Sequence, residues 1–179
     1  MKCAVSDFDR TLYVNETISE KNRRAVRAWQ QAGNWFVLAT GRGEASVREK
    51  LEPYKVYPDI LILNNGAIIR DREGKELFCQ LMKDELARQV LRYLHGINDD
   101  GSGVSTRTKK WNVLSASHTT TQKPGDGVIT IDEIDVLSEV VQIHRRRKGD
   151  EEGILRLCEE VNRRFPEVSA YANVWNADI

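Results

Sequence analysis

Short apolar runs alternate with amphipathic segments over the first 65 or so residues of the chain. The apolar runs cover residues 3–6, 35–40 and 59–67, and between them residues 18–33 and 44–54 place apolar side chains at helical spacing. Strand, helix, strand, helix and strand in this order predict a parallel sheet with right-handed crossovers. We therefore expect an α/β fold for this part of the chain.

The ends of the two predicted helices carry recognisable signals. Thr17 or Ser19 can cap the first helix and Gly33 can end it. Pro53 is expected to stop the second helix, because proline cannot donate the backbone hydrogen bond that a helix interior needs.

A different pattern begins near residue 83. It contains a helical segment at 83–97, an extended segment interrupted by polar residues at 103–117, a loop at 119–127, a strand at 138–146, a helix at 150–165 and an alternating segment at 167–175. These elements predict an open-faced, antiparallel α+β unit, joined to the first part of the chain near residues 78–82.

Composition and charge argue against some classes of binding partner. Its 179 residues include 27 basic and 27 acidic side chains, so no net charge steers it toward nucleic acid or an anionic membrane. No apolar stretch approaches the roughly 20 residues that span a bilayer, and no export signal is visible. Cys3, Cys79 and Cys158 are far apart and form no CxxC pair, which favours a reducing cytoplasm. A small-molecule partner is the best expectation.

Polar residues gather where the first two predicted strands end. Ligands of parallel α/β sheets bind beyond the carboxyl ends of the strands. The residues at this place are Asp7, Asp9 and Thr11 after the first strand, and Thr40, Gly41 and Arg42 after the second.

This set of side chains suits a phosphoryl group and a divalent metal. Mg²⁺ prefers hard carboxylate oxygens, while hydroxyl and backbone N–H groups can hold phosphate oxygens. One carboxylate can attack phosphorus, and a second can protonate the leaving group and later deprotonate water. The spacing of Asp7 and Asp9 permits these two distinct roles.

Three motifs, "DFDRT" at 7–11, "LATGR" at 38–42 and "LNNGA" at 63–67, resemble those of the haloacid dehalogenase superfamily of phosphatases. Their order and spacing are similar to its Cof-type branch (class IIB cap), in which a cap domain is inserted after the third core strand. The resemblance implies a partial Rossmann-like core at 1–80, an α+β cap at 81–175, and the start of a return to the core at 176–179.

The same resemblance assigns roles to the residues of the motifs. It implies that Asp7 is the nucleophile and Asp9 the general acid and base, with Mg²⁺ held by Asp7 and by the backbone carbonyl of Asp9. The remaining assignments are Thr40 and Gly41 as phosphate-binding residues, Thr11 as the residue that orients the loop, and Arg42, Asn65 and Gly66 at the substrate entrance. The implied substrate is a small phosphorylated metabolite, usually a sugar phosphate.

The sequence departs from the family pattern at two places. Arg10 stands where the family usually has glycine, and an unusual backbone angle there would strain an arginine. The lysine and the acidic "GD...D" motif that follow the cap in the family do not occur before Ile179. We therefore expect this chain to be the N-terminal part of a Cof-type phosphatase, impaired by itself, with its first strand as an unpaired edge that favours a homo-oligomer.

The sequence is also compatible with other functions. A catalytically inactive binding or interaction module would keep the fold without the chemistry. Dinucleotide binding is disfavoured, because "TGRG" lacks the G-x-G-x-x-G spacing. The basic run at 144–148 could bind a substrate anion or could form a solvated face.

Overall fold

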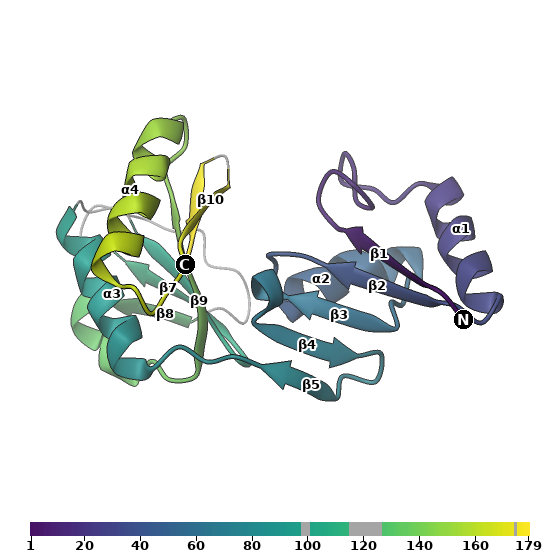
Figure 1. Cartoon of the computed structure of the whole chain (residues 1–179), viewed down its shortest axis with the longest axis horizontal. Coiled ribbons are helices and arrows are strands. Elements are labelled where there is room, and N and C mark those ends of the chain that lie inside the picture. The colour runs from purple at the N-terminus through teal and green to yellow at the C-terminus, as the bar shows by residue number, and fades with distance from the viewer. Residues whose placement is uncertain (98–100, 115–126, 174) are drawn as a thin grey trace. The chain divides into compact units, whose positions relative to one another are not determined.

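The computed structural model describes residues 1–97, 101–114, 127–173 and 175–179. These residues divide into two compact units, Met1–Gln80 and Leu81–Ile179 (Figure 1). Most of the loop expected at 119–127 lies outside the described residues. None of the helices in the described ranges is long and apolar enough to cross a membrane.

The first unit is built on a five-stranded sheet. Its strands lie side by side in the order β1 (Cys3–Asp7), β2 (Trp35–Ala39), β3 (Ile60–Leu63), β4 (Ile68–Asp71) and β5 (Glu76–Cys79) (Figure 1). Strands β1, β2 and β3 are parallel, with Asp7 opposite Ala39 and Ala39 opposite Ile62. The predicted α/β arrangement is confirmed. The carboxyl ends of the three parallel strands lie at the same end of the sheet.

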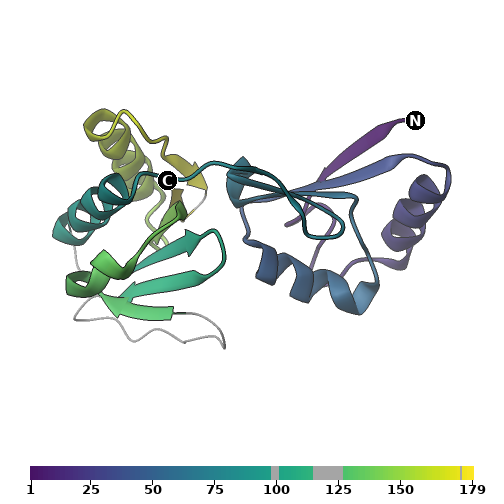
Figure 2. The same ribbon diagram turned by 90° about the horizontal axis from the view of Figure 1, so that it is seen from below.

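The two helices of this unit begin and end near the residues that the sequence indicated. Helix α1 (Glu20–Gln31) is capped by Ser19, whose side chain accepts a hydrogen bond from the amide of Asn22 at 3.1 Å. Gly33 follows its end with φ of 76°, the left-handed angle that glycine tolerates. Helix α2 (Glu44–Leu51), which lies on one face of the sheet in Figure 2, continues into the 3₁₀ turn η1 (Glu52–Tyr54) that contains Pro53.

The hairpin of β4 and β5 is absent from the elements that the sequence predicted. The 3₁₀ turn η2 (Asn64–Gly66) reverses the chain after β3, so that β4 runs antiparallel to β3. A tight turn then leads into β5, with the amide of Asp71 donating to the carbonyl of Lys75 at 3.0 Å and Gly74 at φ of 88°.

The second unit contains a six-stranded sheet in the order β10-β11-β9-β6-β7-β8. The bounds of these strands are β6 (Ser102–Thr106), β7 (Lys110–Leu114), β8 (Gly127–Thr130), β9 (Val140–Arg146), β10 (Tyr171–Asn173) and β11 (Asn176–Asp178). All neighbours are antiparallel except β7 and β8, which are parallel. The expectation of a purely antiparallel sheet is corrected at this pair.

Two helices, α3 (Asp84–Ile97) and α4 (Glu151–Arg164), pack on one face of this sheet (Figures 1 and 2). The short 3₁₀ helix η3 (Ile131–Val136) completes the same apolar layer through buried Ile134. Val90, Val104, Ile143 and Ile154 are fully buried between the helices and the strands. Alternate positions of β9, such as Gln142 and His144, lie outside this apolar cluster.

The last residues of the chain differ from expectation. The sequence placed 176–179 at the start of a return to the core, whereas the structure pairs β11 with β9 inside the second unit. Ile179 exchanges two backbone hydrogen bonds of 2.8 Å with Ile143. Ala177 and Ile179 are 0% and 8% exposed, so burial of their side chains holds this segment in the second unit's core.

The basic run at 144–148 is not one solvated face. Arg145 is 1% exposed, and its Nη1 donates to the hydroxyl of Ser102 at 3.1 Å, whereas Arg146 is exposed. The first three residues of the run, 144–146, belong to β9 and alternate between its two faces, as strand geometry requires.

Candidate active site

Asp7 and Thr40, from the first two motifs, lie at the carboxyl ends of neighbouring strands in the first unit's sheet. Asp7 is the last residue of β1, and Thr40 follows Ala39, its partner in register on β2. Asp7 and Thr40 therefore occupy adjacent strand ends. Thr40 is 7% exposed, and its backbone amide donates to the carbonyl of Ile62 at 2.9 Å.

The loop after β1 is organised around Phe8. Its ring is fully buried and stacks on Tyr13 with 5.1 Å between ring centroids. Its carbonyl accepts hydrogen bonds from the amides of Thr11, Leu12 and Tyr13 at 3.4, 3.1 and 2.8 Å. The Thr11 hydroxyl donates to the Asp7 carboxylate at 3.0 Å, which is the contact that an orienting residue needs.

Arg10 adopts the left-handed backbone conformation, with φ of 63°. This angle is unfavourable for residues with a Cβ and free of strain for glycine. The family's usual glycine at this position thus has a backbone reason, and Arg10 carries a local conformational cost.

Asp9 and Arg42 form a two-pronged ion pair. Nε of Arg42 lies 2.7 Å from Oδ2 of Asp9, and Nη2 lies 2.8 Å from Oδ1. The hydrogen bond to Asp9 raises the pKa of Arg42, with desolvation by burial acting in the opposite direction. Arg42 was expected at the substrate entrance, and here its guanidinium also occupies both oxygens of the Asp9 carboxylate. Each Asp9 carboxylate oxygen therefore accepts one hydrogen bond from Arg42 in this structure.

The loops after β2 and β3 interlock. The amide of Asn65 donates to the carbonyl of Thr40, and the amide of Asn64 to that of Arg42, both at 3.1 Å. A Cβ added to Gly41 would lie only 2.8 Å from Oδ1 of Asn65, so glycine at this position lets the Asn65 side chain lie against the loop after β2. Asn64, Asn65 and Gly66 all have positive φ, at 50°, 54° and 98°.

The Thr40 hydroxyl is suited to donate to a ligand. Its oxygen accepts a hydrogen bond from the amide of Arg42 at 3.2 Å, while its own hydrogen meets no acceptor among the described residues. A buried hydroxyl with an uncommitted hydrogen can donate to a phosphate oxygen.

The oxygens near β1 offer a partial set of metal ligands. The Asp7 carboxylate and the Asp9 carbonyl are hard oxygen donors of the kind that Mg²⁺ prefers. The Asp9 carboxylate is taken up by Arg42. Within the described part of the chain, no three His, Cys, Asp or Glu side chains gather closely enough to hold a metal ion. The fit is therefore to an ion that keeps several waters or substrate oxygens.

A family model described as haloacid dehalogenase-like hydrolase matches residues 4–177. The chain belongs to this family. Among named relatives of this haloacid dehalogenase (HAD) family chain, a 5-amino-6-(5-phospho-D-ribitylamino)uracil phosphatase of Bacillus subtilis is 28% identical over 151 residues, covering 83% of this chain and 59% of that protein. A putative phosphatase of Haemophilus influenzae is 30% identical over 92 residues, covering 51% of this chain and 34% of its own length.

Solved structures share the fold of this HAD family chain. A haloacid dehalogenase-like hydrolase from B. subtilis superposes with a TM-score of 0.79 at 20% identity, covering 99% of this chain and 72% of the other. A HAD subclass IIB sugar phosphatase gives a TM-score of 0.75 at 18% identity, covering 99% and 69%. The named relatives are longer, since the chain spans 34% to 59% of their lengths.

Proposed function

We propose that the chain belongs to a HAD-type phosphomonoester hydrolase that acts on a small phosphorylated metabolite through an aspartyl-phosphate. The observation that carries the proposal is the position of Asp7 and Thr40 at the ends of two adjacent parallel strands, with the Thr11 hydroxyl donating to the Asp7 carboxylate at 3.0 Å. Membership of the HAD hydrolase family and relatives named as phosphatases support the same reaction class.

In the first step, the Asp7 carboxylate attacks phosphorus and the phosphorus–oxygen ester bond breaks. The leaving alkoxide takes a proton from Asp9, so that an alcohol departs and the phosphoryl group stays on Asp7. In the second step, water attacks the same phosphorus and gives its proton to Asp9, while the Asp7–phosphorus bond breaks and releases inorganic phosphate. The second step restores to Asp9 the proton that it donates in the first, and the Arg42 guanidinium lies against this carboxylate in the structure.

The surrounding groups would bind the phosphoryl oxygens. We assign this task to the Thr40 hydroxyl and the Gly41 amide, with Asn65 and Gly66 flanking the entrance, because hydrogen-bond donors fixed before the reaction stabilise the developing charge. Mg²⁺, held by the Asp7 carboxylate and the Asp9 carbonyl, would supply further positive charge to the same oxygens.

A sugar phosphate or a related phosphomonoester is the substrate class that we favour. One relative is named for a substrate with a phosphoribityl group, and one structural neighbour is a sugar phosphatase. We further propose that the second unit acts as a cap that selects the substrate. We also propose that the protein works in the reducing cytoplasm, because Cys3, Cys79 and Cys158 form no disulfide in the structure.

Binding of beryllofluoride, a mimic of a phosphoryl group on a carboxylate, tests the proposal without requiring turnover. With Mg²⁺ present, we expect a bound fluorine NMR signal for the 179-residue chain and none for Asp7→Asn. Asp71→Asn, which changes a carboxylate in the β4–β5 turn, is the matched control and should keep the signal.

Turnover supplies the second readout. We expect phosphate release from a panel of sugar phosphates to fall at least about 10³-fold in Asp7→Asn, because the nucleophile is lost. If the unsubstituted chain neither binds beryllofluoride nor releases phosphate, the proposed reaction is overturned for this chain.

A further inference from the structure

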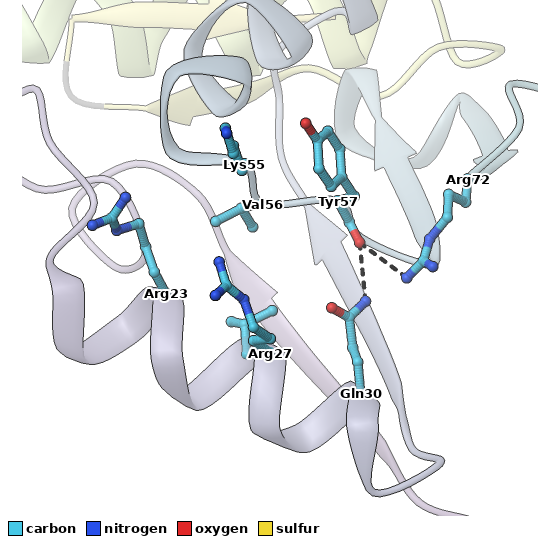
Figure 3. A pocket seen from close by; sticks show the side chains of 8 residues that line it. Arg23, Arg27, Gln30, Lys55, Val56, Tyr57 and Arg72 are labelled. Atoms are coloured by element: carbon cyan, nitrogen blue, oxygen red, sulfur yellow. Dashed lines mark hydrogen bonds between the residues drawn. The ribbon is translucent and has the colours of Figure 1, made fainter.

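The first unit contains a second polar site, a hollow of about 320 Å³ between α1 and the segment that precedes β3. Arg23 and Arg27 project from α1 toward the segment that carries Lys55 and Tyr57, and Arg72 follows the end of β4 (Figure 3). The lining includes four cationic side chains and no acidic one.

The positive charge of this hollow is only partly neutralised by its neighbours. Nη2 of Arg72 lies 2.6 Å from the carboxylate of Asp59, and Arg23 pairs with Glu20, which also contacts another arginine of α1. Within the described residues, no ion pair is formed by Arg27 or Lys55, and Nε of Arg23 is buried without a hydrogen-bond partner.

Hydrogen bonds fix the rim of the hollow before any ligand arrives. The side-chain amide of Gln30 donates to the carbonyl of Tyr57 and to the carboxylate of Asp59, both at 2.9 Å. Nη2 of Arg72 donates to the same Tyr57 carbonyl at 3.2 Å (Figure 3). Val26 and Val56, at 9% and 3% exposed, add apolar surface to the lining.

We infer that this hollow is a binding site for a compact anion of the phosphate ester or diphosphate class, carrying at least two negative charges. Guanidinium groups match phosphate oxygens with paired hydrogen bonds, and lysine adds a point charge. The volume is at the lower end of the range for small-molecule sites.

This anion site is distinct from the candidate active site. Lys55 and Tyr57 precede β3, and Arg72 follows antiparallel β4, so these residues lie at the end of the sheet where β3 begins. Asp7 and Thr40 lie at the carboxyl ends of β1 and β2. The inference does not depend on the proposed phosphatase reaction.

Pyrophosphate binding to the 179-residue chain tests the inference, measured by calorimetry with EDTA present so that no metal contributes. We expect Arg27→Gln and Lys55→Gln each to weaken binding about tenfold, the effect of losing one hydrogen bond to a charged group. Arg24→Gln is the matched control, because it removes the same charge from the same helix at a side chain that is 79% exposed and does not line the hollow. It should change the affinity by less than about twofold, since exposed charges are screened.

Asp7→Asn separates the two sites and should leave pyrophosphate affinity unchanged. Amide chemical shifts should move at Arg27, Val56 and Tyr57. Circular dichroism of each variant checks that it is folded, and Lys55 and Arg27 provide two independent substitutions. The inference is overturned if pyrophosphate does not bind at millimolar concentration, if Arg24→Gln weakens binding as much as Arg27→Gln, or if Asp7→Asn abolishes it.

Discussion

The left-handed conformation of Arg10 ties a single residue to the shape of the candidate active site. Its amide donates to the carbonyl of Tyr13 at 2.9 Å, so its backbone helps to close the loop that carries Asp9 and Thr11. The loop is held by these hydrogen bonds and by buried Phe8, which together compensate for the unfavourable φ of 63°. The contacts of the loop therefore hold Arg10 in the left-handed conformation, which arginine by itself does not favour.

Arg10→Gly should stabilise the first unit by about 0.5–1 kcal/mol, because relief of left-handed strain outweighs the extra freedom of glycine in the unfolded chain. Urea-dependent hydrogen exchange of the β1 and β2 amides measures the change. Arg10→Ala, which removes the side chain but keeps the Cβ, is the control and should give no gain. A loss of stability in Arg10→Gly would contradict the strain argument.

Residues of the candidate site could be predicted where they directly follow a predicted strand. Asp7 and Thr40 follow apolar strands, so parallel pairing brings them to one edge without further information. The ion pair of Asp9 with Arg42 was not predictable, since it joins side chains 33 positions apart through the shapes of two loops. The basic hollow was missed for the same reason, because its arginines and lysine come from α1 and from the two connecting segments that follow η1 and β4.

At the scale of helices and strands, periodicity located most elements and failed where pairing depends on distant segments. The apolar faces of α1, α3 and α4 were visible because each repeats at helical spacing. The β4–β5 hairpin was missed because its strands have only four residues each, too few to show alternation. The parallel pairing of β7 with β8 depends on the chain between them, which local pattern does not describe.

Strand β9 carries a histidine whose environment resists protonation. His144 faces Gly103 on β6, where an added Cβ would lie 2.0 Å from the imidazole, so glycine makes room for the ring. Burial, and secondarily the charge of Lys110, lower the pKa of His144 from 6.5 to about 4. The neutral ring is therefore favoured in the folded second unit.

The second unit should lose stability as the pH falls from 6.5 toward 4, because the unfolded chain takes up a proton at His144 that the folded chain refuses. Above pH 6.5 the neutral His144 ring makes its full contribution to the free energy of unfolding. Below that pH this contribution is lost, by up to about 3 kcal/mol. Urea unfolding across this pH range measures the free energy of unfolding of the second unit. Its dependence on pH should be weaker in His144→Gln.

Lys110→Gln provides a finer test of the cause. It should raise the pKa of His144, followed by imidazole NMR titration, since the second contribution is removed. Lys109→Gln is the matched control, because its ammonium lies over the Trp111 ring at 4.4 Å and is not among the causes of the shift. Equal pH slopes for the unsubstituted chain and His144→Gln would show that burial of this ring does not control the stability.

For the molecule as a whole, the first sheet leaves β1 and β5 at its two edges among the described strands. On β1, Val5 is 62% exposed and Cys3 is also exposed. An apolar edge strand with free backbone groups offers a template for pairing with another strand. This is the physical basis for the homo-oligomer that we expected from the sequence.

The 179-residue chain should self-associate at micromolar concentration through β1, and Val5→Lys should make it monomeric, because a lysine on an edge strand opposes strand addition. Sedimentation velocity over a range of concentrations measures the change. Leu77→Lys is the control on β5, where the side chain is 51% exposed, and should leave association intact. A monomer at all concentrations, or equal effects of the two substitutions, would rule out the β1 edge.

The contact between Gly41 and the Asn65 side chain links the residue types allowed in the loops after β2 and β3. Because a Cβ at position 41 would come within 2.8 Å of Oδ1 of Asn65, a larger residue at position 41 requires the Asn65 side chain to move or to be replaced by a smaller one. Homologous sequences should therefore show covariation at these two positions, with larger residues at 41 found beside smaller ones at 65.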